Sequence, residues 1–325
     1  MKKQKMYCGI DVSSETLDIC YQTADGQKQH KQVKNSRIGF QAIVKECGKN
    51  YHYVMESTGV YHTSLMFYLH EQGMVYSVVN ALQIKRYIQM HLERNKSDKK
   101  DAKRICEYGI DRNPEATQMP DREFFECRTI NNAIHDLTKD ITKMTNQVHS
   151  LKRVPYGTEE ILSTYKTILT KLQKEKIKLE KILNTKLKSW QPELLELVQS
   201  VKGIGKRAAS ELIIYTKGFK DVENYKQLIS YAGLSPVEFT SGSSIKGRVR
   251  ICKQGGKQLR HILYMGALNA KSTNRACREL FDRLVAKGKN KKAAIIAVCN
   301  KLLKQVFGCV KNGVKFQDNY QVYYC

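Results

Sequence analysis

The stretch Tyr7-Cys-Gly-Ile-Asp-Val12 decides the fold of the N-terminal part of the chain. It is a short apolar run with the length of a buried β-strand, so it predicts a first strand. Asp11 lies inside this run, and an unpaired carboxylate is costly to bury without a cation. We therefore expect Asp11 to bind a metal ion.

Three further acidic residues lie where they can join Asp11. Glu56 closes the apolar run Tyr53-Val-Met-Glu-Ser57, and Asp98 and Asp101 stand three residues apart at the predicted start of a helix, where they share one helix face. Four such carboxylates can hold two divalent metals, which clamp the attacking and leaving oxygens of a phosphodiester. Simpler roles stay open: Glu56 as a turn cap, Asp98 as an N-cap and Asp101 as a first-turn acid.

The composition favours a polyanionic partner. The 325 residues include 56 Lys and Arg against 31 Asp and Glu, a formal net charge of +25, so phosphate neutralisation and counterion release would drive binding. No apolar stretch approaches about 18–20 residues, and we expect neither a membrane-spanning helix nor export. The ten cysteines form no CxxC pair, so a reducing cytoplasm fits best and a structural zinc site is not expected.

Residues 1–121 alternate strand and helix patterns. The runs 7–12, 17–22 and 31–33 predict a three-stranded antiparallel meander. Helical patterns, the first capped at Ser36, then alternate with strands around Glu56 and at 75–79. This periodicity predicts a mixed α/β domain, and the order of its elements is that of an RNase H-like sheet.

Residues 122–189 predict two long helices separated by Pro155-Tyr-Gly157. Their apolar residues recur at heptad spacing, which predicts an antiparallel helical hairpin or a pair of oligomerising coiled-coil helices. A first helix packed on the N-terminal domain is the alternative. The two predicted seams are Ile130, Ile134, Leu137, Ile141, Met144, Val148 and Leu151, and then Ile161, Tyr165, Ile168, Leu172, Leu179 and Ile182.

Residues 190–325 are predicted to be mainly helical, and Val201-Lys-Gly-Ile-Gly205 joins two of the helices. Two glycines around an apolar residue are typical of helix-hairpin-helix modules. Backbone N–H groups of such a hairpin bind a DNA phosphate without reading sequence. Gly203, Gly205 and Lys206 are therefore predicted to contact nucleic acid, with a plain tight turn as the alternative.

A loop over residues 240–260 combines hydroxyl side chains, glycines and cations. Glycines let the backbone come close to a phosphate, and one arginine can bind two phosphate oxygens at once. A serine here can attack phosphorus, but composition does not separate a nucleophile from a serine that only hydrogen-bonds a phosphate. The residues predicted to contact nucleic acid are Ser243, Ser244, Lys246, Arg248, Arg250, Lys253, Lys257 and Arg260.

Over nearly its whole length the chain resembles the DEDD-type insertion-sequence transposases of family one hundred and ten, to which the Piv-type DNA invertases are related. The resemblance implies a RuvC-like N-terminal domain over residues 1–121, a coiled-coil linker over 122–189 and a C-terminal transposase domain over 190–325. It rests on five motifs in this order: Gly9-Ile-Asp-Val12, Met55-Glu-Ser-Thr-Gly59, Asn95-Lys-Ser-Asp-Lys-Lys-Asp-Ala102, Gly203-Ile-Gly205 and Ser241-Gly-Ser-Ser-Ile-Lys-Gly247.

The resemblance also implies a reaction. The family's acidic tetrad maps onto Asp11, Glu56, Asp98 and Asp101, which would hold Mg²⁺ or Mn²⁺, and its serine nucleophile maps onto Ser241. The enzyme would cut and rejoin double-stranded donor and target DNA through a covalent phosphoserine intermediate.

The resemblance further implies partners and a setting. A structured non-coding RNA from the element, the bridge RNA, would guide the enzyme by base pairing. The coiled coil would join the subunits of a dimer or tetramer in a prokaryotic cytoplasm, near the nucleoid and away from membranes. Two alternatives stay open: a hydrolytic RuvC-like nuclease such as a Holliday-junction resolvase, which needs no serine, and a DNA- or RNA-binding regulator on a degenerate nuclease scaffold.

Overall fold

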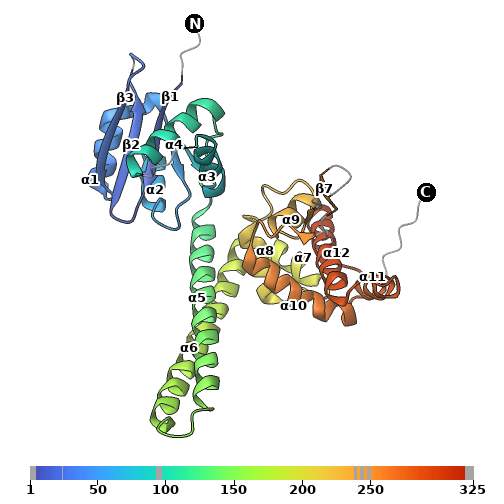
Figure 1. Cartoon of the computed structure of the whole chain (residues 1–325). Coiled ribbons are helices and arrows are strands. Elements are labelled where there is room, and N and C mark those ends of the chain that lie inside the picture. The colour runs from blue at the N-terminus through green and yellow to red at the C-terminus, as the bar shows by residue number, and fades with distance from the viewer. Residues whose placement is uncertain are drawn as a thin grey trace, which may run out of the picture. The chain divides into compact units, whose positions relative to one another are not determined.

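The computed structural model describes residues 5–23, 25–92, 97–237, 240–241, 245–246 and 250–318. The chain forms two compact units, Met1–Met119 and Pro120–Cys325, which Figure 1 shows. The division lies close to the end of the predicted α/β domain. The segments predicted as a linker and a C-terminal domain belong together to the second unit.

The first unit is built on a five-stranded sheet in the order β3-β2-β1-β4-β5. β1, β2 and β3 form the predicted antiparallel meander, whereas β4 and β5 run parallel to β1. The mixed α/β prediction is therefore confirmed. The strands are β1 (Met6–Val12), β2 (Thr16–Gln22), β3 (Lys28–Lys34), β4 (Tyr51–Glu56) and β5 (Val75–Val79).

Helices cover both faces of this sheet. Successive strand residues point to opposite faces, so Cys8 and Gly9 mark the two sides of β1. The Cys8 thiol lies beside Cys47 at the end of α1, and α4 lies directly over Gly9. The helices are α1 (Arg37–Cys47), which starts after Ser36 as predicted, the 3-10 turn η1 (Gly48–Asn50), α2 (Thr63–Glu71), α3 (Ala81–Met90) and α4 (Asp98–Arg112).

The second unit is almost entirely helical, as predicted. In Figure 1, α5 (Arg122–Leu151) and α6 (Glu159–Trp190) run side by side as a long hairpin. One hydrophobic core joins the base of this hairpin to the later helices through residues such as Phe124 and Leu187. These helices are α7 (Pro192–Ser200), α8 (Lys206–Tyr215), α9 (Tyr225–Tyr231), α10 (Lys257–Thr273), α11 (Arg275–Ala286) and α12 (Lys291–Asn312).

Three residues of the seam predicted for α6 do not pack inside the hairpin of this chain. Ile161, Ile168 and Ile182 are exposed by 45%, 39% and 37%. The leucine that follows each isoleucine takes the inner position instead, and Leu183 is only 2% exposed. Each Ile-Leu pair fits the heptad period at either residue, so packing against α5 decides which one is buried.

α12 also departs from the sequence-based expectation that no stretch reaches membrane-spanning size. By length and composition alone this helix could cross a membrane. Its apolar side chains line the core of the second unit, where Val298, Leu302 and Val306 are fully buried. Core packing accounts for this composition.

Candidate active site and nucleic-acid contacts

Asp11 and Glu56 lie at the same edge of the sheet. β1 and β4 are parallel, and Ile10 pairs with Met55, so Asp11 and Glu56 follow at neighbouring levels. Their side chains point to one face, because side chains along a strand repeat every second residue. The rings of Tyr7 and His52, four residues earlier on the same strands, stack with centroids 5.5 Å apart.

A glycine holds α4 against β1. A Cβ atom added at Gly9 would come within 2.1 Å of the Cys106 backbone nitrogen and 2.6 Å of the Ala102 carbonyl oxygen. No other residue fits such an approach without displacing the helix. The motif that carries Asp11 therefore also sets how closely α4 packs.

The direction of α4 brings Asp98 and Asp101 toward Asp11. Farther along the helix than Ala102, Gly109 lies against the Tyr7 ring near the start of β1. α4 thus runs opposite to β1, and its first turn points to the end of the strand that carries Asp11. All four acids of the predicted tetrad therefore belong to elements that meet at one edge.

The first turn of α4 corrects one alternative role. Ser97 is the N-cap, since its side chain accepts a hydrogen bond from the Lys100 backbone N–H. Asp98 is the first helical residue and is exposed, so it does not cap the helix. Asp101 is a first-turn acid, as one alternative predicted, and is only 9% exposed.

Asp18 is an acidic residue that the sequence reasoning missed. It lies directly across from Asp11 on β2 and is 4% exposed. Its oxygens are paired with His30 Nε2 at 2.8 Å and with Gln32 Nε2 at 2.9 Å. A carboxylate inside an apolar run, the pattern that singles out Asp11, is also present at Asp18. Because its oxygens already have partners, Asp18 adds negative charge beside Asp11 rather than a further metal ligand.

The chemistry of the tetrad suits a hard divalent cation, because such ions take carboxylate oxygens as ligands. Among the residues that the structure describes, no three His, Cys, Asp or Glu side chains are grouped closely enough to hold a metal ion. The metal assignment therefore stays a prediction.

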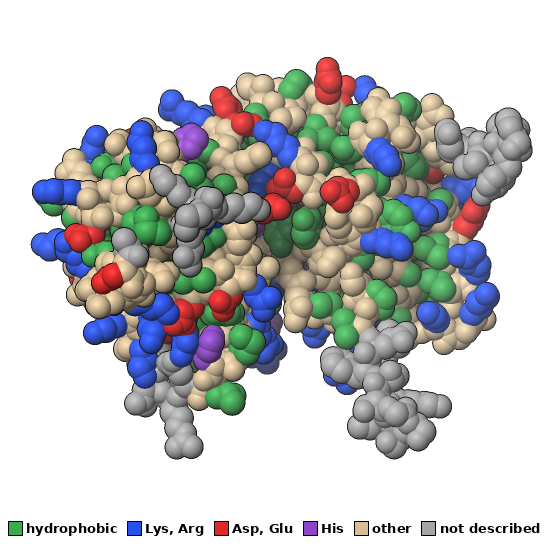
Figure 2. All heavy atoms as spheres, turned by 90° about the horizontal axis from the view of Figure 1, so that it is seen from above, with side chains coloured by type: hydrophobic (Ala, Val, Ile, Leu, Met, Phe, Trp, Pro, Cys, Tyr) green, Lys and Arg blue, Asp and Glu red, His purple; other side chains and the backbone are tan. Residues whose placement is uncertain are grey.

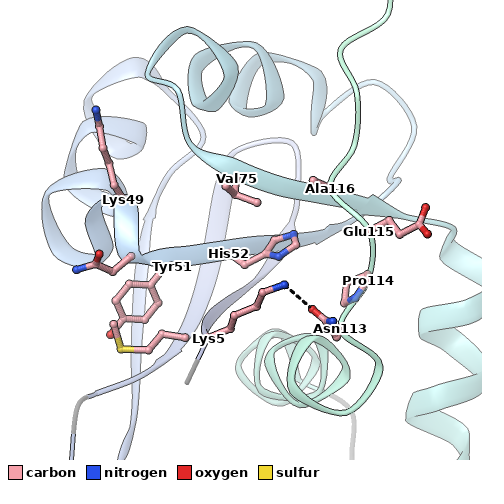
Figure 3. Close-up of a pocket in the computed structure, with 11 residues that line it drawn as sticks. Lys5, Lys49, Tyr51, His52, Val75, Asn113, Pro114, Glu115 and Ala116 are labelled. Atoms are coloured by element: carbon pink, nitrogen blue, oxygen red, sulfur yellow. Dashed lines mark hydrogen bonds between the residues drawn. The ribbon is translucent and has the colours of Figure 1, made fainter. Parts of the chain in front are cut away.

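The opposite edge of the sheet carries a cavity of about 390 Å³, drawn in Figure 3. Lys5 Nζ donates to Asn113 Oδ1 at 3.2 Å, and His52 Nε2 is hydrogen-bonded to Ser77 Oγ at 2.7 Å. Burial, followed by the charge of Lys5, lowers the pKa of His52 below its usual value. The cavity lies where β1, β4 and β5 begin, whereas the acids lie where β1 and β4 end. It is therefore separate from the candidate active site.

In the second unit, the Gly203–Gly205 turn joins α7 to α8 as predicted. Gly203 has a φ of 104°, and a Cβ there would come within 2.5 Å of the Ala270 Cβ, so both conformation and packing require glycine. Gly205 is the N-cap of α8, and a Cβ there would meet nothing within 4 Å. Gly205 and Lys206 are exposed. An anion can therefore approach the start of α8.

A buried polar cluster, absent from the sequence reasoning, fastens α8 to α5. Glu211 is 4% exposed, and its Oε2 pairs with His135 Nε2 at 2.9 Å and accepts from Asn131 at 3.1 Å. Arg207 donates to Asn131 Oδ1. Burial would raise the pKa of Glu211, but hydrogen bonds from His135 and Asn131 and the charge of Arg207 outweigh it, so the pKa is lowered.

The serine loop is carried by two short strand pairs. β6 (Pro236–Val237) pairs with β9 (Arg250–Ile251), and β7 (Thr240–Ser241) pairs with β8 (Ile245–Lys246), with Ser241 opposite Ile245. The predicted contacts Ser243, Ser244 and Arg248 lie outside the described residues, as do the side chains of Ser241 and Lys246.

Part of the predicted phosphate-binding loop also packs against neighbouring elements. A Cβ at Gly255 would come within 2.3 Å of the Tyr231 carbonyl oxygen, and one at Gly256 within 2.7 Å of the Tyr215 ring. Arg260 donates to the Ala232 carbonyl oxygen at 2.9 Å. These residues anchor the loop. Of the predicted cations here, Arg250, Lys253 and Lys257 are exposed.

The predicted site residues of both units fall within matches to transposase families. Residues 8–152 match a family described as transposase, and residues 195–282 match the transposase family IS116/IS110/IS902. The chain belongs to the IS110 family of transposases. The first match contains the four acids, and the second contains the Gly203–Gly205 turn and Ser241. The protein is thus a DNA transposase or recombinase.

Some relatives of this IS110-family transposase have names that describe gene inversion rather than transposition. A pilin gene-inverting protein of Moraxella bovis is 28% identical over 324 residues, which are 96% of this chain and 98% of the relative. That of Moraxella lacunata has the same identity and coverage. A protein of insertion element IS110 from Streptomyces coelicolor is 26% identical over 46% of this chain and 36% of its own length.

Proposed function

We propose that this transposase cuts and rejoins DNA with Ser241 as its nucleophile and with Asp11, Glu56, Asp98 and Asp101 holding Mg²⁺ or Mn²⁺. The proposal is supported by β1, β4 and the first turn of α4, the elements that carry these four acids, which meet at one sheet edge next to the further buried charge of Asp18. The sheet order β3-β2-β1-β4-β5, with the first three strands antiparallel, supports a RuvC-like fold for the first unit.

In the proposed reaction, Ser241 Oγ loses its proton and forms a bond to phosphorus, while the bond from phosphorus to one deoxyribose oxygen breaks. The serine ester keeps the phosphodiester linkage. A deoxyribose hydroxyl of another strand end then loses its proton and bonds to phosphorus, while the bond from Ser241 Oγ to phosphorus breaks and Oγ takes up a proton. The bound metal would stabilise the charge that develops on the phosphate oxygens. The acids hold the metal at a fixed place because the sheet and α4 fix their backbone.

DNA would be held through its phosphates. The exposed start of α8 offers backbone N–H groups and the Lys206 cation, and a helix N-terminus favours an anion. Arg250, Lys253 and Lys257 add exposed cations beside the serine loop. Figure 2 shows lysine and arginine side chains spread over the face that it draws, and a dispersed positive charge suits contacts to the nucleic-acid backbone more than to bases.

The guide RNA and the oligomer are further parts of the proposal. The formal charge of +25 is large enough to bind RNA as well as DNA. The exposed Ile161, Ile168 and Ile182 lie seven or fourteen residues apart on one face of α6, which supports contact between copies of the hairpin.

A second candidate activity is DNA inversion, favoured by the match to pilin gene-inverting proteins along nearly the whole chain. Cutting and rejoining at two sites of opposite orientation inverts the DNA between them. A plasmid carrying such sites would give inverted products if this activity is present and only insertion products if it is not.

The serine assignment is tested by replacing Ser241 with Ala and measuring recombinant DNA and hydrolysed DNA separately. Ser243→Ala and Ser244→Ala are the matched controls from the same loop. We expect Ser241→Ala alone to lose all recombinant product. If Ser241→Ala still cuts DNA in the presence of Mg²⁺ and the wild type yields only hydrolysed ends, the enzyme is a hydrolytic nuclease and the proposal fails.

A further inference from the structure

One side of α6 carries a row of exposed lysines. Lys171, Lys174, Lys178, Lys181 and Lys188 are separated by three, four, three and seven residues, so they lie along one helix face. This face is opposite the side that packs on α5, where Leu172, Leu179 and Leu183 contribute to the hairpin. We call these five residues the lysine row.

Most of the charge in the lysine row is not neutralised within the chain. In the part of the chain that the structure describes, Lys178 has a loose ion pair with Glu175, at 3.7 Å. No ion pair is formed by the other four members with any described residue. The hydroxyls next to the row, such as Thr170 and Thr185, donate to backbone carbonyls of their own helix. Apart from the exposed Ile177, which lines a cavity together with Lys181 and Lys206, ammonium groups are therefore what this face offers a partner.

The dimensions of the row suit a duplex. From Lys171 to Lys188 the helix rises about 26 Å, at about 1.5 Å per residue. B-DNA carries a negative charge every ~1.7 Å of its axis, so a straight helix of this length faces many phosphates. The row contains no aromatic side chain, and stacking on aromatic rings is how unpaired bases are held. A paired backbone fits this face better than a single strand.

We propose that the lysine row is a docking surface for the phosphate backbone of duplex DNA outside the bases that react. DNA is chosen over other polyanions because the chain belongs to a family of DNA transposases. The row shares no residue with the proposed catalytic set, so the proposal does not depend on the role of Ser241 or of the metal.

The test is the salt dependence of DNA binding by the full-length chain. The variant replaces Lys171, Lys174 and Lys181 with Gln, which keeps helix propensity. A labelled 30-base-pair duplex of arbitrary sequence is titrated in EDTA, so that no cleavage occurs. Each lost phosphate contact lowers the slope of log K against log salt by about 0.9, so we expect a slope lower by about 3 and binding at least about tenfold weaker.

Two controls separate the row from general charge. Lys45→Gln, Lys49→Gln and Lys226→Gln remove the same charge from exposed sites elsewhere, and this variant should keep its slope within about one. A variant with Arg in place of Lys171, Lys174 and Lys181 should keep the salt-dependence slope of the wild type, because the positive charge is retained.

Three results would overturn the proposal. One is an unchanged slope in the Gln variant of the row, and another is an equal loss of slope in the control variant. The third is weaker binding to an RNA duplex of the same length with DNA binding unchanged, which would assign the row to RNA.

Discussion

In the first unit, the candidate site is carried by a five-stranded sheet and by a helix pressed against it at Gly9, whereas in the second unit Ser241 lies in a strand of only two residues. The positions of the acidic residues are fixed by the closely packed hydrophobic core of the first unit. The serine loop owes its place to a few anchors, such as Gly255 and Arg260. An acidic side chain can therefore be replaced by an uncharged one without loss of folding. Substitutions that displace the backbone on which the acids stand should destabilise the fold.

The largest effect is expected for Asp11→Asn. The change removes a metal-binding charge while keeping the shape of the side chain, so recombination should fall about 1,000-fold or more, since the metal contributes several kcal/mol of transition-state stabilisation. The free energy of unfolding should stay equal or rise, because Asp18 lies directly opposite. Urea denaturation and product formation measure the two effects. Activity within tenfold of wild type would show that Asp11 does not hold the metal.

Gly9→Ala should act on folding instead. The added methyl group meets backbone atoms of α4 rather than a flexible side chain, so we expect the first unit to lose about 3 kcal/mol or more. Far-UV circular dichroism measures the unfolding of the first unit. Fluorescence of the only tryptophan, Trp190 in the second unit, should show an unchanged unfolding transition. Gly308→Ala is the control. A Cβ at this position of helix α12 meets no atom within 4 Å, so the change should raise the free energy of unfolding by about 0.5–1 kcal/mol. Equal effects of the two substitutions would contradict the account of α4.

A smaller effect is expected for Glu211→Gln, which tests what fastens α8 to α5. Losing the charged partner of His135 and Arg207 should cost about 2 kcal/mol at pH 7. The folded-state pKa of Glu211 is lowered, so its contribution to stability is present above the usual value of 4.5 and is lost as the pH falls through the folded pKa. The difference between variant and wild type, followed by Trp190 fluorescence, should shrink on acidification. A difference in the free energy of unfolding that grows on acidification would contradict a lowered pKa of Glu211 in the folded state.

Much of the first unit could be predicted from sequence, because strand periodicity and a charged residue in an apolar run are local signals. β5 agrees with its predicted bounds, and Asp11 was singled out by its surroundings alone. The use of Gly9 could not be predicted in this way, since it depends on a helix nearly a hundred residues later.

The second unit shows where such signals fail. At Ile168-Leu169 the period allows either residue to face α5, and only the shape of the partner helix selects the leucine. Glu211 and His135 are far apart in sequence and give no local sign of their pairing. Likewise, the close packing of Gly255 against the backbone of Tyr231 has no local sign in the sequence.

The central claim, that Ser241 is the nucleophile of a reaction that needs Asp11, is tested most directly by trapping protein joined to DNA. The enzyme is incubated with Mg²⁺ and a DNA substrate whose nicked strand diffuses away after cleavage, then digested, and the modified peptide is identified by mass spectrometry. We predict a phosphodiester-linked nucleotide on Ser241, absent from Ser241→Ala and strongly reduced in Asp11→Asn. Cleaved DNA without any adduct, or an adduct on another residue, would contradict the claim.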